Sequence, residues 1–287
     1  MARNKNSLLI YDGPNVQDTA GILVIASAFN QRSENGKTLD MIQVFILYRD
    51  EAPTVAVQTG NDEAVCGECF LRPIIAKQLK ESGESNIPCY VDKWRGPGSA
   101  WESWHMGNIA SATPREASAI IATLRSCDCD ANHNRANCPN PGKPLGIRLG
   151  AYGDPASVPD WVWRDLLSML SSKMTSYTHQ WETMPHLAEH TMASIDPITW
   201  PDVDAALDQA HALGFRTYRV LAMGEVPRSD EMMCPEANGL TNCNKCGLCA
   251  GNTRPNTPSI VIPAIRPGPA RVSVSYTHLT LPTIYSV

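Results

Sequence analysis

The chain has 287 residues, of which 43% are hydrophobic, and a formal net charge of −5 at pH 7. This length and composition allow one large domain or two ordinary ones around a sizeable core. The acidic balance and the lack of a Lys/Arg run argue against a sequence-independent nucleic-acid binder, which needs a basic surface to displace counterions. The longest apolar stretches are too short to span a membrane, and the N-terminal one is too short for a secretory signal. We therefore expect a soluble, cytoplasmic protein with no membrane partner.

Residues 1–62 are predicted to form a β-rich region. β-Branched and aromatic residues dominate three runs in it, and polar or glycine-containing segments such as ENGKT separate these runs. This pattern is typical of antiparallel strands joined by short turns. The expected strands are Ile22–Ala28, Met41–Tyr48 and Thr54–Gln58.

Residues 63–145 are predicted to be a cysteine-rich segment with a helix and an insertion. The stretch KWRGPGSAWESWHMGN, rich in Trp, Gly and Pro, is expected to be a loop. Ala112–Leu124 is expected to be helical, because Thr113 can cap its first turn and Glu116 follows three residues later. The next stretch, SCDCDANHNRANCPNPGKP, lacks periodicity and is rich in Asn and Pro, which indicates a surface insertion.

From residue 146 to residue 230, runs with strand character alternate with runs of helical spacing. GIRLGAY, MTSYTHQW, TMASID and FRTYRVLAM are the predicted strands, and Asp160–Leu170 and Pro201–Leu213 are the predicted helices. Such alternation indicates parallel β/α units. We therefore predict an α/β fold that contains a partial or complete β/α barrel-like parallel sheet, an N-terminal β-rich region and cysteine-rich metal-binding segments.

The C-terminal part divides into a four-cysteine metal segment with a strand, residues 231–272, and a tail, residues 273–287. The tail contains VSYTHLTLPT, which resembles the translation of a transposase-type sequencing adapter read in frame. The same letters alternate like an edge strand, which is the alternative interpretation. We expect an assembly artefact there and assign the tail no function.

Four of the ten cysteines fall within the stretch CPEANGLTNCNKCGLCAG. In a reducing cytoplasm clustered thiols indicate metal or redox work rather than a disulfide framework. Four thiolates suit a tetrahedral zinc ion, and they equally suit an iron–sulfur cluster such as [4Fe–4S]. The predicted metal ligands in this stretch are Cys234, Cys243, Cys246 and Cys249.

A second predicted metal site comprises Cys66, Cys69 and Cys89, whose three thiols leave one coordination position unfilled. On zinc that position can take water, a substrate or a histidine such as His105, and the last case gives a purely structural site. On a four-iron cluster it leaves one iron free for a substrate or cofactor. A third group in the predicted insertion, with a local zinc as one reading, consists of Cys127, Cys129, Cys138 and His133.

Polar side chains follow several of the predicted strands of the β/α region. In β/α barrels chemistry collects where strands end and loops begin, so these side chains are candidates for acid–base work or ligand binding. Each of them can instead be a turn, cap or hydrogen-bonded core residue. The predicted catalytic residues are Asp154, His179 and Asp196, and the predicted cofactor-binding residues are Tyr152, Gly153 and Arg219.

With these motifs in view, the chain resembles a group of uncharacterised cysteine-rich proteins common in bacteriophage genomes. The resemblance runs from about residue 30 to residue 262 and is carried by TGNDEAVCGECFLRP, CYVDKWRGPGSAWESW, RLGAYGDPASVP, YTHQW, MASID and the four-cysteine stretch. It implies a location in the cytoplasm of a bacterial host. It implies no activity.

The order of the motifs also resembles a radical S-adenosylmethionine barrel. In that family a three-cysteine cluster binds the cofactor through its open iron, a Gly-Gly-Glu-type motif cradles the amino group of the cofactor, and extra clusters often lie C-terminally. The resemblance would make Cys66, Cys69 and Cys89 the cluster ligands and Gly153-Asp154-Pro155 the cradle. The spacing Cys66-x2-Cys69-x19-Cys89 departs from the compact Cys-x3-Cys-x2-Cys of the family.

Two functions are therefore expected as alternatives. The first is an iron–sulfur enzyme with an open cluster at the mouth of a β/α barrel, acting on a small-molecule or nucleic-acid substrate. The second is a zinc-stabilised, non-catalytic module that binds nucleic acid or a host protein. For the second, Lys93, Arg95, Trp101 and Trp104 mix cations with rings that can stack on bases, although the same stretch can be a packed loop over the barrel end.

Overall fold

The computed structural model describes residues 4–30, 36–83, 89, 91–127, 138–139, 141–170, 173–221, 224–252 and 256–263. Cys129, His133, the side chain of Cys127 and the tail 273–287 lie outside the described residues, so the interpretations made for them stay open. Within the described residues the fold is mixed α/β, and no helix there is long and apolar enough to cross a membrane.

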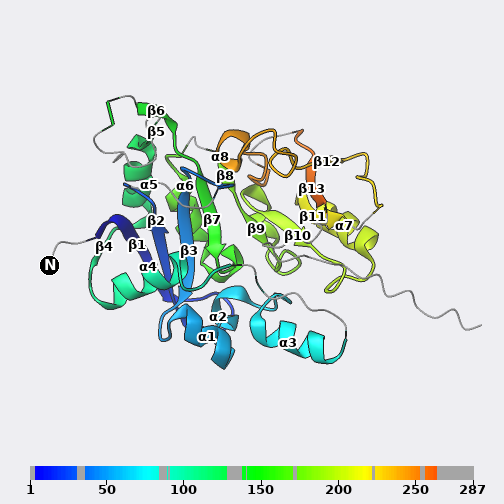
Figure 1. Cartoon of the computed structure of the whole chain (residues 1–287), viewed down its shortest axis with the longest axis horizontal. Helices are drawn as coiled ribbons and strands as arrows, with labels where there is room; N and C mark the ends of the chain where they lie inside the picture. The colour runs from blue at the N-terminus through cyan, green and yellow to red at the C-terminus, as the bar shows by residue number, and fades with distance from the viewer. Residues whose placement is uncertain are drawn as a thin grey trace, which may run out of the picture.

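The N-terminal half is built on a six-stranded sheet in the order β4-β1-β2-β3-β7-β8. β1 to β3 pair in antiparallel fashion, whereas β3, β7 and β8 are parallel, as are β1 and β4. These strands lie on the left of Figure 1. Their bounds are β1 (Asn4–Pro14), β2 (Gly21–Ser27), β3 (Ile42–Tyr48), β4 (Ile109–Ser111), β7 (Ile147–Tyr152) and β8 (Met174–Thr175).

The C-terminal half is built on a five-stranded, wholly parallel sheet in the order β12-β13-β11-β10-β9. Its strands are β9 (Tyr177–Thr178), β10 (Met192–Ile195), β11 (Thr217–Leu221), β12 (Glu231–Met233) and β13 (Ser259–Pro263). A separate two-stranded ribbon consists of β5 (Arg125–Cys127) and β6 (Pro141–Pro144).

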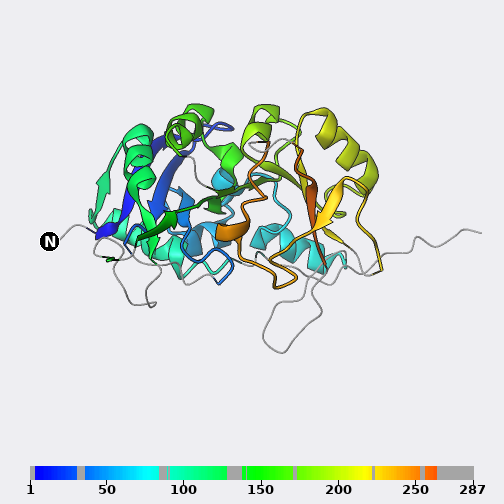
Figure 2. The same cartoon turned by 90° about the horizontal axis from the view of Figure 1, so that it is seen from above.

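Helices cover the two sheets on both sides. Seen from above, α6 and α7 lie along one side and α3 along the other (Figure 2). The helices are α1 (Pro53–Thr59), α2 (Glu63–Cys66), α3 (Pro73–Glu81), α4 (Gly96–His105), α5 (Pro114–Thr123), α6 (Asp160–Leu167), α7 (Val203–Ala212) and α8 (Cys243–Cys246), with short 3-10 turns η2 (Pro155–Ser157) and η3 (Pro185–Glu189).

The predicted parallel β/α units are present, but the described residues form two open sheets and not a closed barrel. The stretch MTSYTHQW, predicted as one strand, is divided between β8 and β9, which belong to different sheets. Ser176 lies between them: its hydroxyl meets that of Thr191 at 3.0 Å, its N–H donates to the carbonyl of Cys249 at 3.0 Å, and its carbonyl accepts the N–H of Met192, the first residue of β10, at 3.0 Å. The chain therefore passes from one sheet to the other at this residue.

Two local predictions were wrong. Thr54–Gln58 is not a strand, because it lies within α1, where Pro53 occupies the first turn and Gly60 ends the helix in a left-handed conformation. These punctuating residues outweigh the β-branched residues between them. The stretch from Gly96 to His105 is helix α4 and not a loop, and Pro97 lies in its first turn. The predicted capping box of α5 is confirmed, since Thr113 and Glu116 bond reciprocally.

The core is continuous through the first sheet. β2 and β3 are buried on both faces for six of their seven residues each, as strands covered by helices on both sides should be. The largest fully buried side chains include Trp163 and Trp181, and the ring N–H of Trp163 donates to the carbonyl of Pro155 at 2.9 Å. That bond fixes the turn that follows β7, where several of the predicted site residues lie.

His190, between η3 and β10, makes the stability of the fold sensitive to acid. It is 4% exposed, and its Nε2 has no hydrogen-bond partner. Burial lowers the pKa of His190 below its usual value of 6.5. The unfolded chain therefore takes up a proton first, and stability should fall as the pH drops below about 6.5.

We expect His190→Phe to reduce this loss, because phenylalanine fills the site without titrating. Urea unfolding at pH 7.5, 6.5 and 5.5 measures the effect, with the exposed His186→Gln as the control. Identical pH slopes for the wild type and His190→Phe would show that His190 is not the group responsible.

Candidate functional site

The predicted second metal site lies in a cavity of about 110 Å³ between the two sheets and the helices below them. Cys66, Cys69 and Cys89 all line this cavity. So do residues of the β/α region, among them Arg148, Tyr152, Gly153, Asp154 and His179. Segments separated by more than 100 residues in sequence thus meet at one place, and three thiols, an imidazole and a carboxylate share one hollow.

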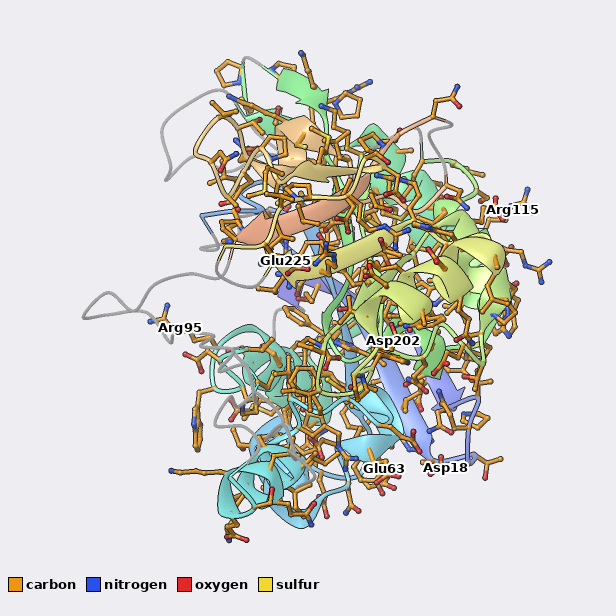
Figure 3. The ribbon with its side chains drawn as sticks, turned by 90° about the vertical axis from the view of Figure 1, so that its right-hand side faces the viewer. Asp18, Glu63, Arg95, Arg115, Asp202 and Glu225 are labelled. Atoms are coloured by element: carbon orange, nitrogen blue, oxygen red, sulfur yellow. The ribbon has the colours of Figure 1, made fainter. Side chains whose placement is uncertain are left out.

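A buried ion pair shapes the loop that carries the first two cysteines. Arg72 and Asp62 are both buried, and the guanidinium lies 3.1 Å from the carboxylate. The same guanidinium donates to the carbonyls of Gly60 and Gly67 at 2.6 and 3.2 Å. Because these carbonyls flank α2, Arg72 holds the helix that ends at Cys66 against the cavity. Glu63, labelled in Figure 3, adds an exposed partner at 3.1 Å.

Asp154 connects the cysteine loop to β9. Its N–H donates to the carbonyl of Val65 at 2.6 Å. Its carboxylate accepts the N–H of Ala156 at 2.9 Å and the N–H of His179 at 2.8 Å. The Nδ1 atom of His179 lies 3.9 Å from the same carboxylate. Asp154 therefore acts as an N-cap of η2 and also positions the histidine at the cavity.

His179 is held between Asp154 and the cysteine loop. Its ring lies edge-on to Phe70, with 6.3 Å between ring centres, and contacts the thiol of the preceding Cys69. Burial disfavours the charged ring, but Cys69, followed by Asp154 and Asp196, raises the pKa of His179 to about 9. The imidazole therefore carries a proton at neutral pH when no cation is bound.

The neighbouring acids and thiols respond to burial in the opposite direction. Burial raises the pKa of Asp154, although His179 and its hydrogen bonds oppose this. Burial and then Cys69 raise the pKa of the Cys66 thiol well above its usual range, and burial likewise raises that of Cys89. Cys66 and Cys89 are thus protonated at neutral pH unless a cation replaces the proton.

Tyr152 and Gly153 close one side of the cavity. Tyr152 is 4% exposed, and its hydroxyl has no hydrogen-bond partner. Burial, followed by Cys66, raises its pKa far above the ordinary value. Gly153 has φ +81°, and a Cβ there would lie 2.7 Å from Ile46, so this position requires glycine. Its role is to let the turn approach β3, and it presents no side chain to a ligand.

Asp196 lies near His179 but does not line the cavity. One oxygen accepts the N–H groups of Ile198 and Thr199 at 2.9 and 2.8 Å, which is the turn geometry considered as an alternative above. The other oxygen is buried without a hydrogen-bond partner. Burial raises the pKa of Asp196. The residue can therefore influence His179 electrostatically without touching a ligand in the cavity.

Arg219 is separated from the cavity, which argues against its predicted cofactor-binding role. Its side chain is 4% exposed and forms a two-point ion pair with Glu231, at 2.7 and 2.9 Å. A further donor reaches Glu225, labelled in Figure 3, at 2.8 Å. Its donors are thus directed at protein carboxylates, and Arg219 joins β11 to β12.

The C-terminal thiols gather beside the second sheet. Cys243 and Cys246 belong to the one-turn helix α8, which Asn242 caps and Gly247 ends in a left-handed conformation. Cys234 donates its N–H to Val261 of β13 at 2.7 Å. After burial, the other thiols raise the pKa of Cys249 to about 12, and burial, then Glu236, Cys234 and Cys246, raise that of Cys243 to about 11. These mutual effects require the four side chains to be neighbours.

Tyr177 belongs to both groups of thiols. It lines the cavity, and its hydroxyl hydrogen-bonds the sulfur of Cys249. Its ring packs against Tyr218, with 4.5 Å between ring centres. The sequence does not predict this contact, because Tyr177 lies inside a predicted strand and belongs to no motif.

In both groups the donors are neighbours but do not converge. Among the residues that the structure describes, no three His, Cys, Asp or Glu side chains are arranged to hold a metal ion. His105, the histidine considered as a fourth ligand, stacks on Trp101 at 4.7 Å between ring centres and does not line the cavity. His179 is the imidazole that the structure places beside the thiols.

The sequence reasoning missed the cations of the cavity. Arg148 lies on β7, the predicted strand GIRLGAY, but the register of β7 against β3 shifts after this residue, so simple alternation does not predict its place at the cavity. Lys93 had been considered only for nucleic-acid binding, but it lines the cavity beside Cys89. No protein-family model, curated protein or solved structure matches the chain at a significant level.

Proposed function

We propose that the chain is a cysteine-ligated metalloprotein of the bacteriophage type, with a reactive centre in the cavity and a second, C-terminal centre. Cys66, Cys69 and Cys89 would hold the first centre, with His179 beside its open position. The observation that carries the proposal is that these three thiols, from two segments of the chain, line one cavity together with two of the residues predicted to be catalytic.

The donor chemistry favours a soft or borderline cation. Three thiols and an imidazole are the ligand types of zinc and of iron–sulfur clusters, and unlike those of magnesium or calcium. Because the donors do not yet converge, binding requires side-chain rotation around the cavity. When bound, such a centre would supply a Lewis-acidic open position.

Asp154 and His179 would position and move a proton at that centre. Metal-bound histidines usually give their second ring nitrogen to a carboxylate, and Asp154 lies on the Nδ1 side of His179. His179 contacts Cys69 and lies 3.9 Å from Asp154, so its ring would stand beside the open position, where an imidazole can hold or move a proton. This pairing supports an enzyme more than a purely structural zinc site.

The cavity is too small for the S-adenosylmethionine expected from the barrel resemblance. Pockets for drug-sized ligands measure roughly 300–1,000 Å³, compared with about 110 Å³ here. Moreover, Asp154 is engaged with Ala156 and His179 and does not form a free cradle. We therefore propose a smaller ligand.

The alternative, a zinc-stabilised binding module, rests on the segment from Lys93 to Trp104. Trp101 donates its ring N–H to the carbonyl of Tyr48 at 3.1 Å and packs against the core, which leaves it unsuited to stacking on a base. Trp94, by contrast, is 77% exposed. This exposed ring beside Lys93 keeps nucleic-acid binding as the second candidate.

One preparation tests the proposal. The chain is purified anaerobically, and its colour, metal content and labile sulfide are measured. Brown protein with sulfide identifies an iron–sulfur centre, whereas colourless protein with about two zinc ions per chain favours the second candidate. Protein that contains neither metal, even after reconstitution, would contradict both.

Variants then locate the first centre. Cys69→Ser should remove one centre, and Glu68→Gln, an exposed change in the same turn, should not. Asp154→Asn and His179→Ala should keep the C-terminal centre but alter ligand binding in the cavity. If both variants leave metal content, ligand binding and any activity unchanged, these residues are structural.

A further inference from the structure

The face of β7 that lines the cavity carries two polar groups that the proposed metal chemistry does not use. Arg148, Gly150 and Tyr152 alternate along the strand and all line the cavity. The first is half-buried, and the last is 4% exposed. Gly150 has φ +63°, and the carbonyl of Gly153 lies 2.7 Å from the place of its missing Cβ, so the turn after β7 packs closely against the strand between Arg148 and Tyr152.

Among the described residues, neither the Arg148 guanidinium nor the Tyr152 hydroxyl has a hydrogen-bond or ion-pair partner. The hydroxyl of Tyr152 has no hydrogen-bond partner, although buried tyrosine hydroxyls usually have one. For Arg148 the structure gives no ion pair and no hydrogen bond within the residues that it describes. A guanidinium offers five donors in a planar fork, which suits carboxylates and phosphates.

The charge balance of the cavity is positive once internal pairs are removed. Arg72 and Asp62 neutralise each other, and Asp154 is matched by His179. Lys93 and Arg148 remain as cavity-lining cations, and the ammonium of Lys93 donates to the carbonyl of Val91 at 3.3 Å. Two permanent cations and one unpaired hydroxyl thus face a hollow with room for several water-sized groups.

From this arrangement we infer that the cavity binds a small oxyanion, a carboxylate or phosphate group, held by Arg148 and the Tyr152 hydroxyl next to the thiols. The inference deepens the proposed function and rests on it for the location of the site. It names the ligand class: a molecule whose anionic group is anchored on β7 while its remaining atoms reach the open position.

A competing role for the same cations is to stabilise the thiolates of Cys66, Cys69 and Cys89. Lys93 does lower the pKa of Cys89, so this role has support. The two roles differ in their consequences. If the cations serve the thiolates, removing Arg148 weakens metal binding, whereas if they serve a ligand, removing it weakens anion binding and leaves the metal in place.

The test is calorimetric titration of the full chain, as purified with its metal, with sodium phosphate and with sodium acetate at constant ionic strength. Sodium chloride is the blank. Comparing the two anions shows whether the site prefers a phosphate or a carboxylate group. Arg148→Gln should weaken binding of the preferred anion at least about tenfold, and Tyr152→Phe by about two- to tenfold, because charged hydrogen bonds are the stronger ones.

The matched control is Arg115→Gln. Arg115 is exposed on α5, does not line the cavity, and lies on the opposite side of the molecule from Arg95 (Figure 3). It should bind the anions as the wild type does. If Arg148→Gln fails to unfold cooperatively, Lys93→Gln and Tyr152→Phe replace it, and unchanged affinity in both overturns the inference.

Metal content is measured on every variant, so that the two proposals fail separately. Arg148-dependent anion binding by a chain without metal would support this inference and contradict the proposed function. A metal-loaded chain that binds neither anion would overturn this inference alone. Loss of metal from Arg148→Gln with unchanged anion affinity would also overturn it, in favour of the thiolate role.

Discussion

Cys249→Ser should release the metal of the proposed C-terminal centre and lower the free energy of unfolding by several kcal/mol. Binding of structural zinc by small domains is worth on the order of 10 kcal/mol or more, and much of it is lost with one of four ligands. Cys249 is 7% exposed and neighbours Cys234, Cys243 and Cys246. Metal analysis and chemical unfolding of the same samples measure both effects.

Lys245→Ala is the matched control, because Lys245 lies between two of the cysteines on α8, is exposed and has no thiol. It should keep its metal and its stability. The raised pKa values of Cys243 and Cys249, about 11 and about 12, add a pH signature. Since a metal must displace these protons, apparent affinity should weaken as the pH falls. Full metal content in Cys249→Ser would refute the four-thiol centre.

Glu231→Ala should destabilise the fold by about 3–5 kcal/mol, the range for removing one partner of a buried ion pair. Glu231 and Arg219 have side-chain exposures of 1% and 4%, so the substitution leaves a guanidinium in the interior. Urea unfolding measures the effect as a lower midpoint with an unchanged slope.

Glu225→Ala is the control for this prediction, because it removes a partner of the same Arg219 that is 43% exposed. Solvent screens that pair, so its loss should cost about 1 kcal/mol or less. Replacing the ion pair by apolar residues, Arg219→Met with Glu231→Leu, should restore much of the stability. Equal effects for Glu225→Ala and Glu231→Ala would show that burial does not set the strength of this pair.

Local signals in the sequence predicted local structure well where propensity, capping and pattern agreed. Thr113, Pro114 and Glu116 specify the start of α5 with their own side chains, and the structure confirms it. The alternation of strands and helices after residue 146 likewise predicted parallel pairing. The prediction of a strand at Thr54–Gln58 was wrong because Pro53 and Gly60 mark the two ends of a helix, and these signals outweigh the β-branched residues between them.

The candidate site was predictable in its chemistry but not in its geometry. Cysteine spacing and strand-end position selected Cys66, Asp154 and His179, which the fold places at one cavity. The position at a strand end also selected Arg219, but this residue is paired with the carboxylate of Glu231. Spacing alone cannot distinguish the two cases, because the partner of a buried charge comes from another strand.

The hydrogen bond between the hydroxyl of Tyr177 and the sulfur of Cys249 affects how loss-of-function variants are interpreted. Tyr177 therefore contacts a C-terminal thiol and also lines the cavity that contains Cys66, Cys69 and Cys89. Loss of activity in Cys249→Ser would consequently not show that the proposed C-terminal metal ion takes part in the reaction. Tyr177→Phe removes this hydrogen bond and leaves every cysteine in place. If this variant loses activity as Cys249→Ser does, the lost contact explains the effect; if it stays active, the lost thiol does.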